Sequence, residues 1–448
     1  MPSDGGPSTA LQLSPERAVD VIEADENHQA ALQNYAAAVG NGFYARDNGG
    51  LSGKYDNVRR HWEDQITRYA LGGFIEPSYA AWRRSLSRVR VLDLGAGAGE
   101  GYELLTSLAT VGNSVNHADF DLLPADMLGH YRGLDISPEM VAMGRSASAG
   151  VPKVEFETRD LALGLGPEAE APPYHIYFSS YGSLSHLHDD ELARLIEDIL
   201  DHQGERALFV ADLLGRYSYE WQCYWADSGT DESNMRQYSM SYLYPDDILD
   251  EIEVERFPIR YWSATEFDTF IDGIVEAKGG RVVRRAMMDR SILVGRHMDS
   301  AEYNALARPI RAAVNSLHEF NRRTDLSTLV FDYMPQPGFD ELNAFFDRFQ
   351  MVWNAVVYGA IEAVEHADDP AWLREAPSEE YPPIVQEALT TIRDVVRNAH
   401  WFKMGDPRAN IVEPQLGYIL RDIEIEEGRG FGAGHGLLAM YEFERAPA

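Results

Sequence analysis

A glycine-rich turn is the segment of this chain whose residues could do chemistry most directly. It spans residues 93–99, Asp-Leu-Gly-Ala-Gly-Ala-Gly, and follows an apolar run that predicts a buried strand over residues 89–94. Where such a turn opens a helix, its backbone N–H groups can approach an anionic or extended polar ligand closely. The glycine spacing alone is weak evidence for a site, because glycine turns are common.

Two details of the turn separate one class of ligand from another. The dinucleotide-binding fingerprint has its third glycine one position after Gly99, where this chain has Glu100. The carboxylate of Asp93, at the end of the strand, would repel a pyrophosphate and would suit a positively charged amino group. The turn therefore favours a ligand that carries an amino group over a nicotinamide dinucleotide.

The turn and three later segments resemble, in order, the motifs of class I S-adenosylmethionine (SAM)-dependent methyltransferases. Residues 91–99 resemble the first motif, residues 133–140 (Gly-Leu-Asp-Ile-Ser-Pro-Glu-Met) the second and residues 158–161 (Thr-Arg-Asp-Leu) the third. Residues 178–187 resemble the end of the fourth strand and the loop after it. The resemblance covers about residues 79–298 and implies SAM as the cofactor and methyl donor.

The same resemblance implies which residues hold SAM. The glycine turn would hold its methionine part, Asp135 the ribose hydroxyls and Asp160 the adenine amino group, while the backbone at Ser179 would approach the SAM amino group. The cofactor-binding residues implied in this way are Asp93, Gly95, Ala96, Gly97, Gly99, Asp135, Ile136, Asp160, Leu161 and Ser179.

The assignment of Asp135 has one alternative. The interval from Asp93 to Asp135 is about twice the roughly 20 positions that are usual in nucleotide-binding βαβ units. Residues 111–130 are interpreted as an insertion after the first helix. If they held the second strand instead, the ribose partner would lie there, but the run Asp-x-Ser-Pro-Glu-Met favours Asp135.

Three residues near the expected methyl position are candidates for the catalytic step, which needs an aligned acceptor and, for an O–H or N–H group, a base. His186, after the expected fourth strand, is the leading candidate because imidazole titrates near neutral pH, although it could instead cap the next helix. Tyr181 would line the same rim. Asp212, at the end of the fifth strand, is a further candidate, but a structural salt bridge is the stronger expectation. No Cys/His cluster has metal-ligand spacing, so no metal is expected.

Strands that alternate with helices must position these residues. Apolar, β-branched runs predict five strands, at residues 89–94, 131–134, 154–156, 175–178 and 207–213. Helices are expected between them, notably at 138–146 and 189–199. This order predicts an α/β fold with a doubly wound, mostly parallel sheet, and the resemblance implies the seven-stranded, Rossmann-like methyltransferase fold. A helix from Ser263 to about Lys278 and two strands, 281–287 and 291–296, are expected to close the sheet.

The predicted domains are an N-terminal helical cap over residues 1–88, a SAM-binding domain over 89–299 and a C-terminal helical domain over 300–448. A helix is expected from Ser14 to about Val39. Residues 214–262 are rich in Tyr and Trp, and they would form either a lid over the acceptor or ordinary packing.

The C-terminal region resembles no motif, and it is the expected surface of a possible homodimer. Helices are expected at about 301–318, 339–365 and 382–398. Strands at 417–420 and 436–441 would form a terminal β-hairpin across a glycine loop.

Charge and composition narrow the partners. The formal net charge of −33 argues against a nucleic-acid acceptor. One cysteine, no signal peptide and no membrane-spanning run predict a cytoplasmic protein with no membrane partner. The leading hypothesis is methyl transfer to O, N or C of a small molecule, in specialised metabolism. The alternatives are a nicotinamide-dependent oxidoreductase and a non-catalytic SAM-binding scaffold.

Overall fold

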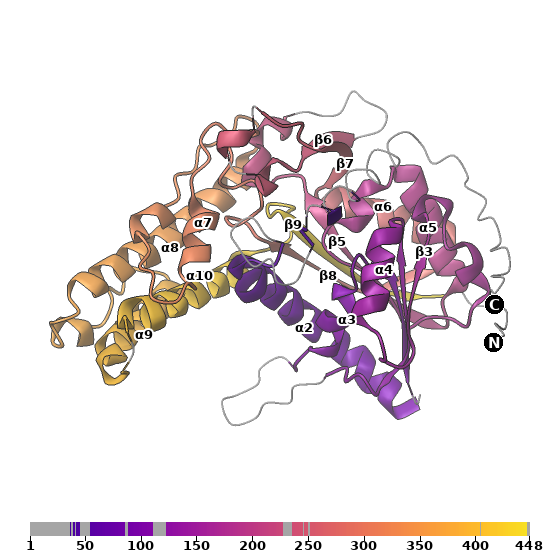
Figure 1. Ribbon diagram of the computed structural model, residues 1–448, viewed down its shortest axis with the longest axis horizontal. Helices are drawn as coiled ribbons and strands as arrows, with labels where there is room; N and C mark the ends of the chain where they lie inside the picture. Colours follow the sequence, from indigo (N-terminus) through magenta and orange to yellow (C-terminus); the bar gives the residue numbers. More distant parts are fainter. Residues whose placement is uncertain are drawn as a thin grey trace, which may run out of the picture.

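Figure 1 shows the computed structural model of the chain. The structure describes residues 36, 39–40, 42–44, 54–85, 88–110, 122–226, 235–244, 246–249, 251–403 and 405–445. Three predictions fall wholly or partly outside the described residues. They concern the helix from Ser14, residues 111–121 of the insertion and residues 227–234 of the aromatic segment.

One sheet organises the described part of the chain. Its strands are β1 (Val89–Leu94), β2 (Leu128–Asp135), β3 (Val154–Thr158), β4 (Ile176–Ser179), β5 (Arg206–Gly215), β6 (Met235–Ser239), β7 (Arg256–Trp262), β8 (Arg281–Arg290) and β9 (Gly436–Glu444). Seven of them run in the order β3–β2–β1–β4–β5–β9–β8, and only β9 is antiparallel to its neighbours. The predicted α/β class, with a mostly parallel seven-stranded sheet, is confirmed. Strands β6 and β7 form a hairpin joined to the carboxyl end of β5.

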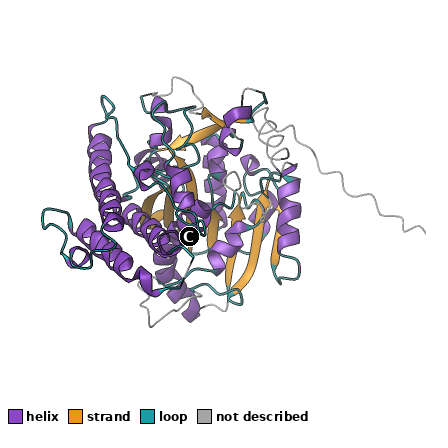
Figure 2. Ribbon diagram, turned by 60° about the vertical axis from the view of Figure 1, so that its left-hand side comes forward, coloured by secondary structure: helices purple, strands orange, loops and turns teal. Residues whose placement is uncertain are grey.

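Helices cover both faces of this sheet, as Figure 2 shows. They are α2 (Asp64–Ser85), α3 (Glu100–Thr106), α4 (Pro138–Ala147), α5 (Asp189–His202) and α6 (Ala264–Ala277). Successive residues of β1 point to opposite faces. Val91 packs in a cluster with residues of α2, α3 and α4, whereas Leu92 packs in a cluster with residues of α5 and α6. The predicted helix after Ser263 is α6, and Ser263 is its N-cap.

The sheet is not closed as predicted, because residues 291–296 form no strand. Ser291 has φ of 61° and ends β8, and the N–H groups of Ser291 and Ile292 donate to the carboxylate of Glu424 at 2.6 and 3.0 Å. This carboxylate therefore takes the hydrogen bonds that a strand partner would have accepted. The closing strand is β9, which follows the helical segment in sequence and lies between β5 and β8.

The segment between β8 and β9 is mostly helical. Its helices are α7 (Ile310–Ser316), α8 (Asp340–Glu365), α9 (Pro383–Asn398) and α10 (Glu413–Glu427). Helices α8 and α9 were predicted, and α7 is shorter than expected. They share one apolar core with Trp62 and neighbouring residues that lead into α2. None of the described helices is long and apolar enough to cross a membrane.

The predicted terminal hairpin is wrong, because residues 417–420 lie inside α10. Leu416, Leu420 and Ile423 recur at helical spacing and are buried. Gly417 interrupts this apolar run where the helix meets the His318 ring, since a Cβ there would lie 2.7 Å from His318 Nε2. The division of the chain at residue 300 remains a prediction.

Candidate active site

A cavity of about 230 Å³ lies where the parallel strands end. Its walls include the segments that follow β1, β2, β3, β4 and β5, which is the edge where open α/β sheets bind ligands. The π-helix η1 (Arg59–Glu63), the β6–β7 hairpin and the ends of β8 and β9 complete the walls. The site is therefore built by the sheet and by segments outside the resembling region.

The glycine turn forms one wall of the cavity. Gly95, Ala96 and Gly97 line it, and the N–H groups of Gly95 and Ala96 donate to the Leu134 carbonyl at 2.8 Å. Gly95 has φ of 76°, and a Cβ on it would lie 2.3 Å from the Cβ of Ser183, so this position needs glycine for two reasons. Gly99 is the N-cap of α3 and does not line the cavity.

Asp93 also does not line the cavity. Its side chain is fully buried, accepts a hydrogen bond from the Tyr131 hydroxyl and lies against Gly101 of α3. Burial raises the pKa of Asp93 to about 7. In this structure Asp93 supports the turn and α3, and its contact with the cofactor stays a prediction.

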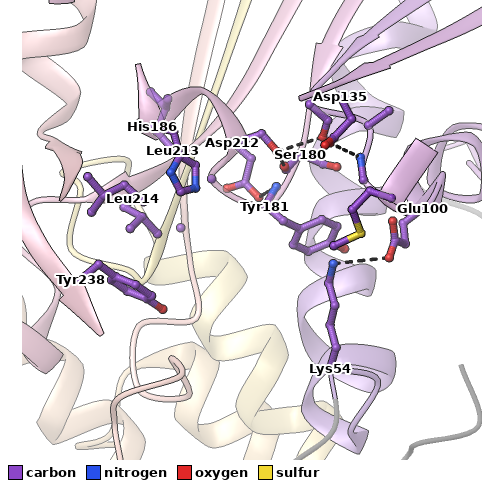
Figure 3. Close-up of a pocket in the computed structure, with 18 of the residues that line it drawn as sticks. Lys54, Glu100, Asp135, Ser180, Tyr181, His186, Asp212, Leu213, Leu214 and Tyr238 are labelled. Atoms are coloured by element: carbon purple, nitrogen blue, oxygen red, sulfur yellow. Dashed lines mark hydrogen bonds and ion pairs between the residues drawn. The ribbon is translucent and has the colours of Figure 1, made fainter. Parts of the chain in front are cut away.

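The two acids expected beyond the turn do line the cavity, together with Ile136 and Leu161. The carboxylate of Asp135, which Figure 3 labels, accepts from the N–H groups of Gly97 at 2.8 Å and Ser137 at 2.9 Å. Burial raises its pKa. Asp160 caps the short helix after β3 by accepting from the Ala162 N–H at 3.0 Å. Both carboxylates are thus fixed in place at the cavity wall.

The approach of the Ser179 backbone to the SAM amino group stays a prediction, and its side chain is turned away from the cavity. Ser179 is fully buried in the last position of β4 and does not line the cavity, whereas the next residue, Ser180, does. The alternation of strand side chains accounts for this difference, because successive residues point to opposite sides.

Glu100 is a site residue that the sequence interpretation treated only as a departure from the dinucleotide fingerprint. It opens α3 and lines the cavity, where Lys54 Nζ lies 3.4 Å from its carboxylate. Burial alone would raise the pKa of Glu100, but Lys54 and Arg59 lower it to about 2. The carboxylate of Glu100 is therefore ionised, and Figure 3 shows it paired with Lys54.

Tyr181 and Asp212 both line the cavity, and other contacts hold the Tyr181 hydroxyl and Oδ2 of Asp212, whereas the buried Oδ1 of Asp212 has no hydrogen-bond partner among the described residues. Tyr181 has φ of 57°, and its hydroxyl donates to Asp64. Burial raises its pKa well above the usual value, so the phenol stays protonated. Asp212 pairs with Arg290 and accepts from the Tyr181 N–H at 2.8 Å. The expected salt bridge of Asp212 is present, and the catalytic roles of both residues stay predictions.

His186 also lines the cavity. It lies in the 3-10 helix Ser183–His186 that follows β4, and its ring centroid is 5.0 Å from that of Phe257 in β7. The sequence prediction that this residue reaches the rim of the site is therefore compatible with its position, and its catalytic role stays a prediction.

A buried cluster of charged side chains lies at the wall of the cavity that η1 and the end of β8 form. The carboxylate of Glu63 lies 2.9 Å from Arg311, 3.7 Å from Arg296 and 4.0 Å from Arg290. Burial would raise the pKa of Glu63, but these arginines hold it well below its usual range. Arg311 also binds Asp56 at 2.8 Å, which ties α7 to the segment before α2. No sequence motif marked these residues, because they come from segments that lie far apart in the chain.

Part of the aromatic segment 214–262 lines the cavity, and another part packs in the protein core. Residues of the β6–β7 region line the cavity, namely Tyr238, Met240, Tyr242, Leu243, Phe257 and Ile259. Tyr219 and Trp225 pack instead in the core of the helical segment. The hairpin thus supplies an apolar and aromatic wall.

No family model and no curated protein matches this chain. Among solved structures, magnesium protoporphyrin IX methyltransferase from Synechocystis PCC 6803, with bound SAM, is similar at 15% identity, with 60% of this chain and 94% of that chain covered and a TM-score of 0.34. A SAM-dependent methyltransferase from Clostridium acetobutylicum ATCC 824 is similar at 12% identity, 51% and 86% coverage and a TM-score of 0.32.

A third similar structure is CalS10, an amino pentose methyltransferase from Micromonospora echinaspora, at 18% identity, 33% and 49% coverage and a TM-score of 0.22. These likenesses are distant, so the fold is described from the strand order of this chain itself. With β9 antiparallel between β5 and β8 and the glycine turn after β1, the chain has the Rossmann-like fold of class I SAM-dependent methyltransferases.

Proposed function

We propose that this chain is a SAM-dependent methyltransferase that methylates O, N or C of a small molecule in specialised metabolism. The observation that carries the proposal is that the glycine turn, Asp135 and Asp160 all line one cavity, in the order that the resemblance implies. The ion pair of Glu100 with Lys54 at 3.4 Å beside the turn adds support, because it offers both a negative and a positive group to the amino acid part of SAM.

The residues at the sheet edge fit SAM. Each oxygen of Asp135 accepts one backbone N–H and keeps a second lone pair for a ribose hydroxyl. Glu100 offers a negative charge for the amino group of the methionine part. When bound, SAM supplies an electrophilic methyl group; the protein would bind it, keep water away and align the acceptor.

The character of the remaining walls supports a small acceptor. The cavity is lined by aromatic and aliphatic residues of the β6–β7 region and is limited in volume, as is common for sites that enclose small molecules. Charged residues are present there, but they are paired with one another, as in the Asp212–Arg290 pair. An acceptor with an apolar or aromatic body suits these walls.

Calorimetric titration of the protein with SAM and S-adenosylhomocysteine tests the proposal. We expect binding by the wild type and at least a tenfold loss in Gly97→Arg, because Gly97 lines the cavity with φ of 53°. The matched control is Gly273→Arg, on the exposed face of α6, where a Cβ would meet nothing within 4 Å. This variant should bind SAM as the wild type does.

A thermal-shift comparison of SAM with NAD separates the proposal from the oxidoreductase alternative. Stabilisation by SAM and not by NAD is expected. Absence of SAM binding in calorimetry, or stabilisation by NAD alone, would contradict the proposal. A protein that binds SAM but methylates nothing in a broad acceptor pool would favour the scaffold alternative.

A further inference from the structure

The glycine-rich segment 430–436, which overlaps the glycine loop of the predicted terminal hairpin, is held by hydrogen bonds on several sides. The buried carboxylate of Asp289 accepts from the N–H groups of Phe431 and Gly432 at 2.8 Å and of Ala433 at 3.0 Å. The backbone of His435 is held on both sides, since its N–H donates to Ser291 and its carbonyl accepts from Gly215, each at 3.1 Å. The segment therefore presents the His435 side chain to the cavity in a defined position.

One nitrogen of this imidazole is bound to a buried acid. His435 Nδ1 lies 2.7 Å from Oε2 of Glu220, whose side chain is fully buried. Glu220 fits there because residue 295 is glycine, as a Cβ at Gly295 would lie 2.1 Å from Oε2. Burial would raise the pKa of Glu220, but His435 and the N–H of His297 lower it. A carboxylate therefore holds the proton of His435 on Nδ1 and leaves Nε2 as an acceptor.

The negative charge of Glu220 acts on His435 and not on the second imidazole nearby, because that imidazole is neutral. The second imidazole near Glu220 is His297, whose pKa burial lowers to about 4, and whose Nε2 donates to the Ser239 carbonyl at 2.9 Å. His297 is therefore neutral near pH 7. Among the described residues, none forms a hydrogen bond with Nε2 of His435. The groups that face His435 are Glu220, Trp221 and Tyr238, with His297 behind Glu220 and the Asp212–Arg290 pair beside Gly436.

We propose that Nε2 of His435 is the general base of the reaction, that Glu220 is its positioning residue, and that the acceptor is a phenol-type hydroxyl group. This inference rests on the proposed function. A phenol has a pKa near 10, so at neutral pH it must lose a proton for efficient attack, and the aromatic wall of the β6–β7 region suits a planar ring. Of the candidates named from the sequence, the Tyr181 hydroxyl donates to Asp64 and Asp212 is ion-paired with Arg290, so the proposal competes with the prediction that His186 is the base.

The proton and charge balance is complete with the groups named. The acceptor hydroxyl loses its proton to Nε2 of His435, and its oxygen forms the new bond to the methyl carbon. The bond between that carbon and the donor sulfur breaks, and its electron pair stays on sulfur as a neutral thioether. The positive charge of the donor is thereby replaced by that of the His435 imidazolium, which Glu220 stabilises at 2.7 Å.

The first test measures the tautomer of His435 without any turnover. In ¹⁵N-histidine-labelled full-length protein, the His435 signals are assigned by their loss in His435→Gln. We expect the Nδ1–H tautomer at pH 8, and in Glu220→Gln a titration midpoint at lower pH than in the wild type. An Nε2–H tautomer in the wild type, or an unchanged midpoint in Glu220→Gln, would overturn the proposal.

The second test measures methyl transfer from radiolabelled SAM to a panel of simple phenols, alkyl amines and carboxylic acids. We expect transfer to phenols, with kcat lowered at least 100-fold in His435→Gln and a rise of kcat with pH that this variant lacks. Glu220→Gln should lower kcat with little change in KM. His400→Gln, the same change at an exposed residue, is the matched control.

The outcomes separate this inference from the proposed function. If neither the wild type nor His435→Gln binds SAM in calorimetry, the proposed function fails. If both bind SAM but the panel is methylated only at amines or carboxylates, or His435→Gln keeps the pH profile and rate of the wild type, the proposed function stands and the role of His435 is refuted.

Discussion

Replacement of Asp289 is the change whose size can be worked out best from the structure. This carboxylate is fully buried in β8, and it accepts three backbone N–H groups of the segment that leads to β9. In Asp289→Ala all three donors lose their partner inside the protein. Each unsatisfied buried donor costs about 1–3 kcal/mol. Some of that loss is offset, because burial of the carboxylate raises its pKa and so opposes folding at neutral pH.

The expected loss in the free energy of unfolding for Asp289→Ala is therefore about 3–5 kcal/mol, at the lower end of three such donors. Asp289→Asn makes a graded comparison. Oδ1 accepts from Gly432 and Ala433, whereas Oδ2 accepts only from Phe431. An asparagine whose carbonyl takes the place of Oδ1 loses one acceptor. The free energy of unfolding of Asp289→Asn should therefore fall by about 1–2 kcal/mol.

Urea unfolding of the full-length protein, followed by tryptophan fluorescence, gives both values from the midpoint and slope. The matched control is Asp272→Ala, where a half-exposed aspartate pairs with Arg285 and a change below about 1 kcal/mol is expected. Equal losses for the Ala and Asn variants, or a loss in Asp289→Ala no larger than in the control, would refute the reasoning that three buried N–H groups depend on this carboxylate.

Three further predictions follow from the same kind of contact. Asp135→Ala should weaken SAM binding by about 10–100-fold in calorimetry, as expected for lost hydrogen bonds to a charged group, while an unchanged affinity would contradict its assigned place at the site. Burial raises the pKa of Asp93 to about 7 in the folded state. The wild type should therefore lose stability relative to Asp93→Asn as pH rises from 4 to 7, and lose no more above pH 7. Urea unfolding at several pH values tests this, and the same dependence of stability on pH in both proteins would refute it. In Gly101→Ala the new Cβ would lie 2.1 Å from Asp93 Oδ2. Overpacking should lower the free energy of unfolding by about 1–3 kcal/mol. A lower melting temperature would support this prediction, and an unchanged melting temperature would contradict it.

The part of the fold that the sequence predicted is the part that depends on local pattern. Strands β1 to β5 are short apolar runs with helices between them, and the turn after β1 carries its glycines within seven residues. Each of these signals is read from neighbouring positions, so the strands themselves could be predicted, and with them the positions of Asp135 and Asp160 just after their ends.

The errors arose where a distant residue decides the local structure. Residues 291–296 are apolar and β-branched, as a strand would be, but Glu424 takes the N–H groups of Ser291 and Ile292. Likewise, no local pattern shows that residues 436–444 pair with β5 and not with a neighbouring hairpin partner. Long-range pairing of strands is not encoded in the spacing of apolar residues within them.

The same limit applies to the candidate site. Glu63 and Arg311 lie far apart in the sequence, and neither belongs to a motif, yet they form one buried ion pair beside the cavity. His435 stood in a segment that the sequence described only as glycine-rich. His435 can be recognised as a candidate base only from the structure, which places Glu220 2.7 Å from its Nδ1.

The position of β9 in the sheet has a consequence for the synthesis of the protein and for fragments of it. Because this strand lies between β5 and β8, both of these strands keep an unpaired edge until residues 436–444 have left the ribosome. The whole helical segment must be synthesised first, so the nascent chain carries an open sheet for much of its translation. A fragment that stops near residue 300 would keep the glycine turn but expose those two edges, and we expect it to aggregate when expressed alone.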